Sequence, residues 1–201
     1  MNCIDQVVTD RYTAIHGDCV GALRGLPDHC IGYSIFSPPF ASLYTYSNSP
    51  RDMGNVRDDA EFFEHFDYLI TVRAPGESER VRHTADEYPV DLWQKVASPI
   101  WMDINPSDTL QFRSAREHDD ERHICPLQLE VIRRGVMLWT NPGDIVLSPF
   151  MGIGSEGYVS LELGRRFVGV ELKHSYYRQA ASNLASVAKP ATADLFSTEA
   201  A

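Results

Sequence analysis

The sequence predicts an α/β fold with a mostly parallel sheet. Two apolar segments, CIGYSIF (30–36) and DIVLSPF (144–150), contain many β-branched and aromatic residues, which predicts a buried strand in each, and each includes or runs into a Ser-Pro corner. The second segment continues through a Gly-x-Gly turn into a helical pattern and then into a third apolar segment, RRFVGVEL (165–172). This order of strand, glycine turn, helix and strand is typical of sheets that bind ligands at the carboxyl ends of their strands.

The other elements follow from local patterns in chain order. Residues 12–18 (YTAIHGD) form a predicted strand that ends at a Gly-Asp turn, and one or two helical turns follow before Pro27. Apolar residues at helical spacing predict a helix over 60–69, which leads into a predicted strand at 68–76. Three further segments have helical periodicity: 126–139, 154–164 and 175–188.

Length and composition predict one globular domain over residues 1–189, with an irregular, polar stretch at 75–122 and a disordered tail at 190–201. The chain has 201 residues, of which 43% are hydrophobic and 23% charged, so it can build a core. It contains neither an apolar run of membrane-spanning length nor a signal-peptide pattern at its start, so we expect a soluble cytoplasmic protein. The four cysteines include no Cys-x-x-Cys pair, which favours free thiols over a zinc site or disulfides.

The net charge of −10 argues, by itself, against a nucleic-acid partner. Net charge does not locate charge, however, and the arginines occur in small groups. These groups are Arg80 and Arg82; Arg113, Arg116 and Arg122; Arg133 and Arg134; and Arg165 and Arg166. A solvated surface is the ordinary interpretation of such groups.

The segment 144–172 carries the clearest ligand signal. Gly152 and Gly154 allow a sharp turn and a close approach of the backbone to a ligand, and Glu171 follows about twenty residues later, where an acid can bind the two hydroxyls of a ribose. A tight turn without a ligand is the alternative. The loop has no basic residue for a pyrophosphate, and its next glycine, Gly157, does not match a dinucleotide fingerprint cleanly. A cofactor with a ribose but no phosphate, S-adenosylmethionine, therefore fits better.

Four motifs together resemble the amino-directed DNA methyltransferases in which the catalytic motif precedes the cofactor motif. Residues 37–40 (SPPF) resemble the catalytic D/S/N-P-P-Y/F, and residues 148–155 (SPFMGIGS) resemble D-P-F-x-G-x-G-T. Residues 16–19 (HGDC) and 123–128 (HICPLQ) resemble segments that lie near the adenine and the methionine end of the cofactor. The resemblance covers roughly residues 10 to 66 and 90 to 185, and its strength lies in the family order of the motifs.

The resemblance implies a Rossmann-like, S-adenosylmethionine-dependent methyltransferase sheet and methyl transfer to the exocyclic amino group of cytosine or adenine in double-stranded DNA, with the target base flipped out. The implied catalytic residues are Ser37, Pro38, Pro39 and Phe40. The implied cofactor-binding residues are Asp18, Cys19, Pro126, Gln128, Ser148, Pro149, Phe150, Gly152, Gly154, Ser155, Glu171 and Leu172.

The Ser-Pro-Pro-Phe corner suits this chemistry because an exocyclic amino group is a poor nucleophile, with its lone pair delocalised into the ring. The Ser37 hydroxyl and the Pro38 carbonyl would accept its N–H bonds from fixed positions, and the two prolines would keep these acceptors in place. Phe40 would stack on the flipped base. No metal ion and no covalent enzyme intermediate are required. A merely rigid loop is the alternative for this corner taken alone.

Two departures from the family pattern affect these expectations. Ser148 stands where an acid is common, so we expect weakened cofactor binding. Residues 62–70 (FFEHFDYLI) run almost directly into residues 71–84 (TVRAPGESERVRHT), which lead into the possible target-reading segment at 75–122. This indicates an internal deletion and a sheet that is incomplete at one edge.

Three hypotheses stay open at this point: an active DNA methyltransferase, a truncated module that binds S-adenosylmethionine without turnover, and a methyltransferase for a protein or a small molecule. A serine at the first position of the catalytic motif, Ser37, favours cytosine as the methylated base but does not exclude adenine. The recognition sequence, a restriction partner, the source and the oligomeric state, a homodimer included, are open as well.

Overall fold

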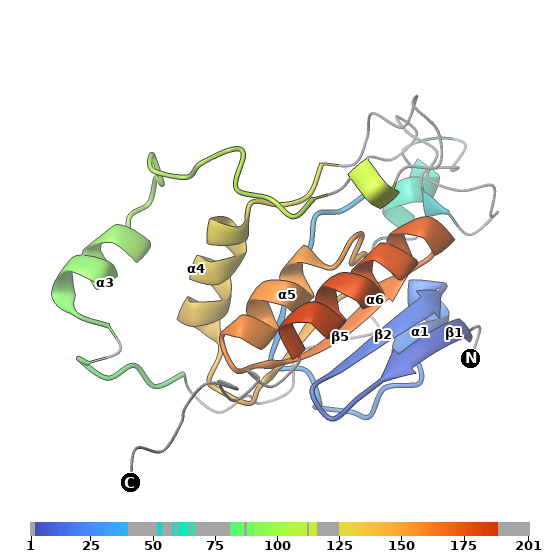
Figure 1. Cartoon of the computed structure of the whole chain (residues 1–201), viewed down its shortest axis with the longest axis horizontal. Coiled ribbons are helices and arrows are strands. Elements are labelled where there is room, and N and C mark those ends of the chain that lie inside the picture. The colour runs from blue at the N-terminus through green and yellow to red at the C-terminus, as the bar shows by residue number, and fades with distance from the viewer. Residues whose placement is uncertain are drawn as a thin grey trace, which may run out of the picture.

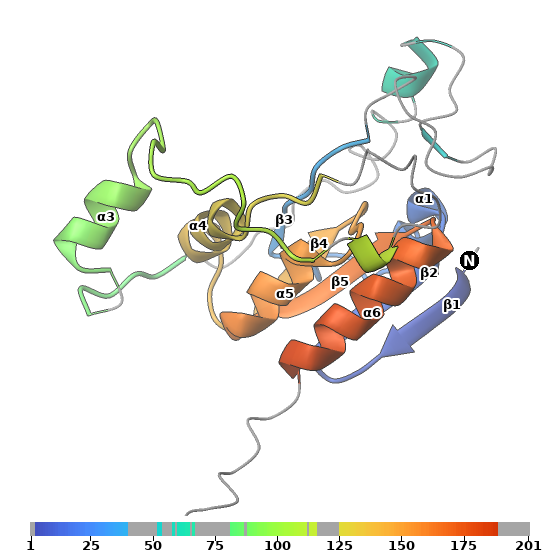
Figure 2. The same cartoon turned by 45° about the horizontal axis from the view of Figure 1, so that its top comes forward.

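The computed structural model describes residues 3–39, 52–53, 58, 60–64, 66, 81–86, 88–111, 113–115 and 125–188. These residues contain one five-stranded sheet in the order β1-β2-β5-β4-β3 (Figures 1 and 2). The strands are β1 (Cys3–Val8), β2 (Tyr12–Gly17), β3 (Tyr33–Ser34), β4 (Ile145–Ser148) and β5 (Arg166–Glu171). β1 pairs with β2 in antiparallel fashion and every other pairing is parallel, so β2, β3, β4 and β5 end at the same edge.

Helices cover both faces of the sheet. They are α1 (Cys19–Leu23), α3 (Val90–Val96), α4 (Leu129–Trp139), α5 (Ser155–Glu162) and α6 (His174–Ala188), with a 3₁₀ turn η3 at Arg113–Ala115. Successive residues of a strand contribute to the hydrophobic cores on opposite faces of the sheet. On one face Ala14, Val146 and Phe167 pack with α4, α5 and α6. On the other face Ile15, Leu147 and Val170 pack with α1. No helix in the described part of the chain is long and apolar enough to cross a membrane.

The periodic segments formed the elements that their sequences predict. The segments 12–18, 144–150 and 165–172 contain β2, β4 and β5. The segments 126–139 and 154–164 contain α4 and α5, and the segment 175–188 contains all of α6 except its first residue, His174. Residues 60–64 and 66 are helical, within the helix expected at 60–69. The strand predicted at 68–76 and the tail at 190–201 lie outside the described residues.

The prediction of a buried strand over 30–36 was wrong in length and in burial. β3 has two residues, and Ser34 is exposed. The backbone on either side still follows β4, since Gly32 N–H donates to Ile145 O at 2.9 Å and Ile35 N–H donates to Leu147 O at 3.1 Å. The segment is exposed because β3 is the last of the described strands on its side, in line with the expected incomplete edge.

Two elements were not predicted. β1 carries mostly exposed side chains at the other edge of the sheet. α3 lies within 75–122, the stretch expected to be irregular, and projects away from the sheet beyond α4 (Figures 1 and 2). Both elements are short and bury few residues, so neither carries a strong apolar pattern.

Candidate active site

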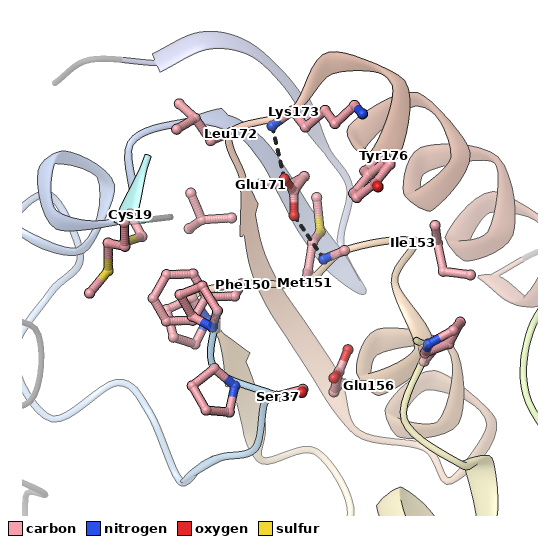
Figure 3. A pocket seen from close by; sticks show the side chains of 18 of the residues that line it. Cys19, Ser37, Phe150, Met151, Ile153, Glu156, Glu171, Leu172, Lys173 and Tyr176 are labelled. Atoms are coloured by element: carbon pink, nitrogen blue, oxygen red, sulfur yellow. Dashed lines mark hydrogen bonds between the residues drawn. The ribbon is translucent and has the colours of Figure 1, made fainter. Parts of the chain in front are cut away.

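A pocket of about 160 Å³ lies at the carboxyl edge of the sheet (Figure 3). Each parallel strand leads into a segment that lines it: 17–19 after β2, 37–39 after β3, 149–153 after β4, and 171–173 at and after the end of β5. Residues 52–53 and 125–127 and the start of α5 contribute further wall. This edge is where open α/β sheets bind their ligands.

The two Ser-Pro corners meet in this pocket, as their place at the ends of neighbouring parallel strands requires. Pro38 and Pro39 line it together with Pro149, Phe150 and Gly152. Phe40, the last residue of the expected catalytic motif, lies outside the described residues.

An aromatic cluster lies behind the two corners. The rings of Phe36 and Phe150 meet edge to face with centroids 5.6 Å apart, and the ring of Phe66, which is helical like residues 60–64, lies 6.3 Å from that of Phe36. Phe62 stacks on Phe66 at 5.8 Å. Aromatic pairs of this geometry resist displacement, so they hold the segment before Ser37 against the segment after β4.

Glu171 organises the cofactor loop from the end of β5. One carboxylate oxygen accepts the Gly152 N–H at 2.9 Å and the other accepts the Lys173 N–H at 2.8 Å (Figure 3). Burial, with the nearby charge of Asp52, raises the pKa of Glu171 to about 7 against the pull of these hydrogen bonds. Each oxygen has a second lone pair, so the carboxylate can still accept a hydroxyl.

The loop between β4 and α5 has a backbone that suits glycine. Gly152 and Gly154 have φ of 52° and 86°, in the left-handed region. Gly157 has a packing role instead, because a Cβ there would lie 2.5 Å from the Phe167 side chain and 2.6 Å from Leu184. Gly157 thus lets the helix approach the sheet closely, which is what the last glycine of a nucleotide fingerprint does.

The segment after β2 combines a capping acid with an unreactive thiol. Asp18 caps α1 by accepting the Gly21 N–H at 3.0 Å. Burial, with the charge of Asp18, raises the pKa of Cys19 to about 12, so Cys19 lines the pocket as a neutral thiol.

The pocket gathers most of the expected site residues but not all. Gln128 caps α4 and Gly154 caps α5, and neither lines the pocket. Ser148 does not line it either: its side chain is fully buried, and its hydroxyl has no hydrogen-bond partner among the described residues. The expected residues that do line the pocket are Asp18, Cys19, Ser37, Pro38, Pro39, Pro126, Pro149, Phe150, Gly152, Ser155, Glu171 and Leu172.

Several lining residues were missed by the sequence analysis, and Glu156 is the most informative. It is the second residue of α5, is only 4% exposed, and faces the pocket. Burial, with the negative charge of Glu171, raises the pKa of Glu156 to about 8. Acidic residues are common in the first turn of a helix because they interact favourably with the helix dipole. The position of Glu156 in the sequence therefore did not mark it as a binding-site residue. The other missed residues include Asp52, Met53, Lys173 and Tyr176.

Comparison with known proteins places the site in a family context. The DNA methylase (N6/N4 methyltransferase) family model matches residues 43–182, well over half of the chain. The type II methyltransferase M.BglII of Bacillus subtilis is 40% identical over 74 residues, which are 36% of this chain and 21% of that protein. The putative methylase YubD of Escherichia coli (strain K12) is 34% identical over 96 residues, 45% of this chain and 40% of that protein. The chain therefore spans less than half the length of these curated relatives.

Solved structures share the fold. TTHA0409, a putative DNA modification methylase from Thermus thermophilus complexed with S-adenosyl-L-methionine, aligns with a TM-score of 0.62 and 18% identity over 91% of this chain and 98% of that one. The PvuII DNA methyltransferase (cytosine-N4-specific) aligns with a TM-score of 0.58 and 16% identity over 90% of each chain. At this level of identity the similarity concerns the fold alone.

Proposed function

Since the chain belongs to the DNA methylase family, we propose that it transfers a methyl group from S-adenosylmethionine to the exocyclic amino group of cytosine or adenine in double-stranded DNA. The observation that carries this proposal is the meeting of the Ser37-Pro38-Pro39 corner and the glycine loop after β4 in one pocket. A cofactor site next to a pair of fixed acceptors is what methyl transfer to an amino nitrogen requires.

The cofactor half of the pocket suits an adenosine. Glu171 ends β5 with a carboxylate that keeps acceptor capacity for ribose hydroxyls, and Phe150 and Leu172 supply apolar walls for a base. Ser155 begins α5 on the same wall, and its buried hydroxyl has no hydrogen-bond partner among the described residues. When bound, S-adenosylmethionine supplies the electrophilic methyl group.

The other half of the pocket receives the base. Ser37 and Pro38 offer a hydroxyl and a carbonyl as acceptors for the amino N–H bonds, and the prolines prevent the corner from relaxing. We assign Phe40 to stacking on the base once it has left the helix. Three further positions were assigned to cofactor binding: Gln128, Ser148 and Gly154. In this proposal they affect cofactor binding indirectly, by shaping the loop after β4 and the starts of α4 and α5.

A direct assay tests the proposal and identifies the base. Unmethylated duplex DNA is incubated with the purified full chain and S-adenosylmethionine, digested to nucleosides and analysed by mass spectrometry. The expected product is N4-methylcytosine or N6-methyladenine, which should be absent with Pro38→Ala or Phe40→Ala. Absence of any methylated nucleoside, across DNAs of varied sequence, contradicts the proposed activity.

One observation favours a second candidate, a module that binds S-adenosylmethionine without turnover. The described sheet ends at β3, and the chain covers only 21% and 40% of the two curated relatives. Calorimetric binding of S-adenosylmethionine together with no methylated nucleoside would select this alternative. Labelled protein in place of labelled DNA would instead reveal a different methyl acceptor.

A further inference from the structure

We infer that the Glu156 carboxylate is the counter-ion for the positively charged sulfur of the methyl donor, and that it makes the site prefer the donor over the uncharged product that remains after transfer. This inference rests on the proposed function, because it presupposes S-adenosylmethionine in the pocket. It adds a role for a residue that lies outside every motif used to assign the site.

Glu156 is buried and has no charged partner among the residues that the structure describes. Its side chain is 4% exposed and lines the pocket. In the described part of the chain its carboxyl group accepts only its own backbone N–H and forms no ion pair. Glu162, the other glutamate of α5, contrasts with it, since Glu162 accepts a 2.7 Å hydrogen bond from Arg133 outside the pocket. A buried carboxylate without a counter-charge is costly, so Glu156 favours a bound cation, which the described residues do not supply.

The position of Glu156 indicates which part of a ligand it meets. In Figure 3 the Glu156 carboxyl group and the Ser37 hydroxyl lie in the same part of the pocket, away from Glu171. With a ribose at Glu171, the reactive end of the donor lies toward Ser37, where the acceptor amino group must be. Glu156 therefore lies at the end that carries the sulfonium.

The charged surroundings of Glu156 strengthen the argument. Within the described part of the chain, the other titratable residues that line the pocket are Asp18, Asp52, Cys19, Cys125, Glu171, Lys173 and Tyr176. The ammonium group of Lys173 lies over the Tyr176 ring, 4.6 Å from its centroid, and neither β4 nor α4 contributes a titratable side chain to the lining. Three other carboxyl groups against one ammonium make the pocket acidic. Burial together with Glu171 raises the pKa of Glu156 to about 8 before a ligand binds.

The sulfur of the donor loses its positive charge in the reaction, so a carboxylate beside it affects the binding of donor and product differently. The amino nitrogen forms a bond to the methyl carbon, the electron pair of the broken S–C bond stays on sulfur, and the nitrogen gives up a proton to solvent water. The sulfur thereby becomes a neutral thioether. A carboxylate that pairs with the sulfonium loses its partner at this step, so the product is held less tightly than the donor.

Calorimetric titrations with three ligands test the inference. S-adenosylmethionine carries the sulfonium and an α-ammonium, S-adenosylhomocysteine carries the ammonium alone, and 5′-methylthioadenosine carries neither. We expect the wild-type protein to bind S-adenosylmethionine more tightly than S-adenosylhomocysteine. Glu156→Gln should weaken binding of S-adenosylmethionine by about 10- to 100-fold and leave the other two ligands nearly unchanged. Glu162→Gln, on the same helix but outside the pocket, is the matched control.

Proton release gives an independent readout. Because a bound cation favours the ionised carboxyl group, wild-type protein at pH 7 should release a proton on binding S-adenosylmethionine but not S-adenosylhomocysteine. Titrations in buffers of different ionisation enthalpy measure this release, which Glu156→Gln should abolish. Thermal unfolding without ligand shows that the variant folds. Since the raised pKa favours the protonated form, the wild-type protein should lose stability as pH rises toward about 8, and the variant should lose less.

The outcomes separate the inference from the function on which it rests. Equal weakening of S-adenosylmethionine and S-adenosylhomocysteine by Glu156→Gln would make the α-ammonium the partner and overturn the inference. Unchanged binding of all three ligands would overturn it as well and leave Glu156 with a packing role. If the folded wild-type protein binds none of the three ligands, the proposed function itself fails.

Discussion

At the scale of single residues, Glu171 connects the sheet to the cofactor loop. Its carboxylate accepts backbone N–H groups from Gly152 and Lys173, so it fixes the loop after β4 relative to the end of β5. The same group is the proposed acceptor for the ribose. Hydrogen bonds to a charged acceptor are each worth about 1.5–3 kcal/mol, so removing the charge should be costly.

We predict that Glu171→Gln weakens binding of S-adenosylmethionine by about 10- to 100-fold, because an amide offers one acceptor oxygen and no charge. Isothermal titration calorimetry measures the change. Glu162→Gln again serves as the control and should bind as the wild-type protein does. Equal affinity of Glu171→Gln and the wild-type protein would remove Glu171 from the site.

The pKa of Glu171 predicts a dependence on pH. Its value of about 7 means that the carboxyl group takes up a proton as pH falls below 7 and then accepts hydroxyl donors less well. Affinity for adenosine, which has the ribose but no charge that Glu156 could sense, should therefore fall between pH 8 and pH 5.5, by up to about tenfold per pH unit. Fluorescence or calorimetric titration measures it. The dependence should vanish in Glu171→Gln, and a flat wild-type profile would contradict the assignment.

Single residues also show what the sequence could and could not reveal about the site. Glu171 and Gly152 were identified because a strand, a glycine turn and a distant acid form a spaced pattern. Glu156 and Asp52 were not, because their importance arises from burial against segments far away in the chain. Ser148 illustrates the reverse case: its motif position suggested a ligand contact, but the last residue of β4 is fully buried.

At the scale of elements, α5 packs against both β5 and its neighbour α6 through a position that only glycine can occupy without a shift. A Cβ on Gly157 would lie within 2.6 Å of Leu184 and within 2.5 Å of Phe167. The periodicity of α4 and α6 was predictable because one face of each is buried. α5 is buried over most of its surface and was predictable from the glycine turn before it and Gly164 after it. β1 and α3 were not, because pairing with β2 and contacts with adjoining segments, rather than their own patterns, hold them in place.

We predict that Gly157→Ala destabilises the protein by about 1–3 kcal/mol, because the added methyl group overpacks the contact between α5, β5 and α6. Ser182→Ala on the exposed side of α6 is the control and should change stability little. Denaturant unfolding measures both variants. A stability of Gly157→Ala equal to that of the wild-type protein would show that the contact can relax at no cost.

The segment that carries α3 is attached to α4 through a buried arginine. Arg134 is 1% exposed, bonds to Asp103 at 2.7 and 3.0 Å and to Glu130 at 2.9 Å, and lies 5.1 Å from the centre of the Trp101 ring. These bonds hold the pKa of Asp103 well below its usual range, with Lys95 contributing. The lowered pKa means that the attachment is present above about pH 4 and is lost as Asp103 takes up a proton at lower pH.

We therefore predict that Asp103→Asn loosens residues 88–103 without unfolding the sheet. Removing the Asp103 charge leaves the positive charge of the buried Arg134 guanidinium group less well neutralised. The guanidinium group is then held less firmly, so Trp101, which packs against it, is also less fixed. Hydrogen exchange should speed up across residues 88–103 and stay unchanged in β4 and β5. Uniform acceleration over the whole chain would mean that the pair supports global stability instead, and no acceleration would mean that it is not needed for the attachment.

At the scale of the whole molecule, parallel pairing brings together segments that are distant in sequence. Residues 17–19, 37–39, 149–153 and 171–173 line one pocket because four strands end at the same edge of the sheet. The proposed division of labour follows from this arrangement: the loops after β4 and β5 hold the donor, and the corner after β3 holds the acceptor.

This division predicts that Pro38→Ala separates turnover from binding. The variant should reduce methyl transfer to DNA below detection, because the acceptors of the corner are no longer fixed. Its affinity for S-adenosylmethionine should change little. Single-turnover kinetics with labelled donor measures methyl transfer, and calorimetry on the same preparation measures the affinity for S-adenosylmethionine. Loss of both transfer and affinity would argue against separate donor and acceptor halves of the pocket.

The most direct measurement is a crystal structure of the full chain with S-adenosylmethionine. We expect the ribose hydroxyls within hydrogen-bond distance of Glu171, the adenine between Phe150 and Leu172, and the methyl group directed toward Ser37 and Pro38. A donor bound elsewhere, or one whose methyl group faces away from the corner after β3, would contradict the shared pocket on which the proposed chemistry depends.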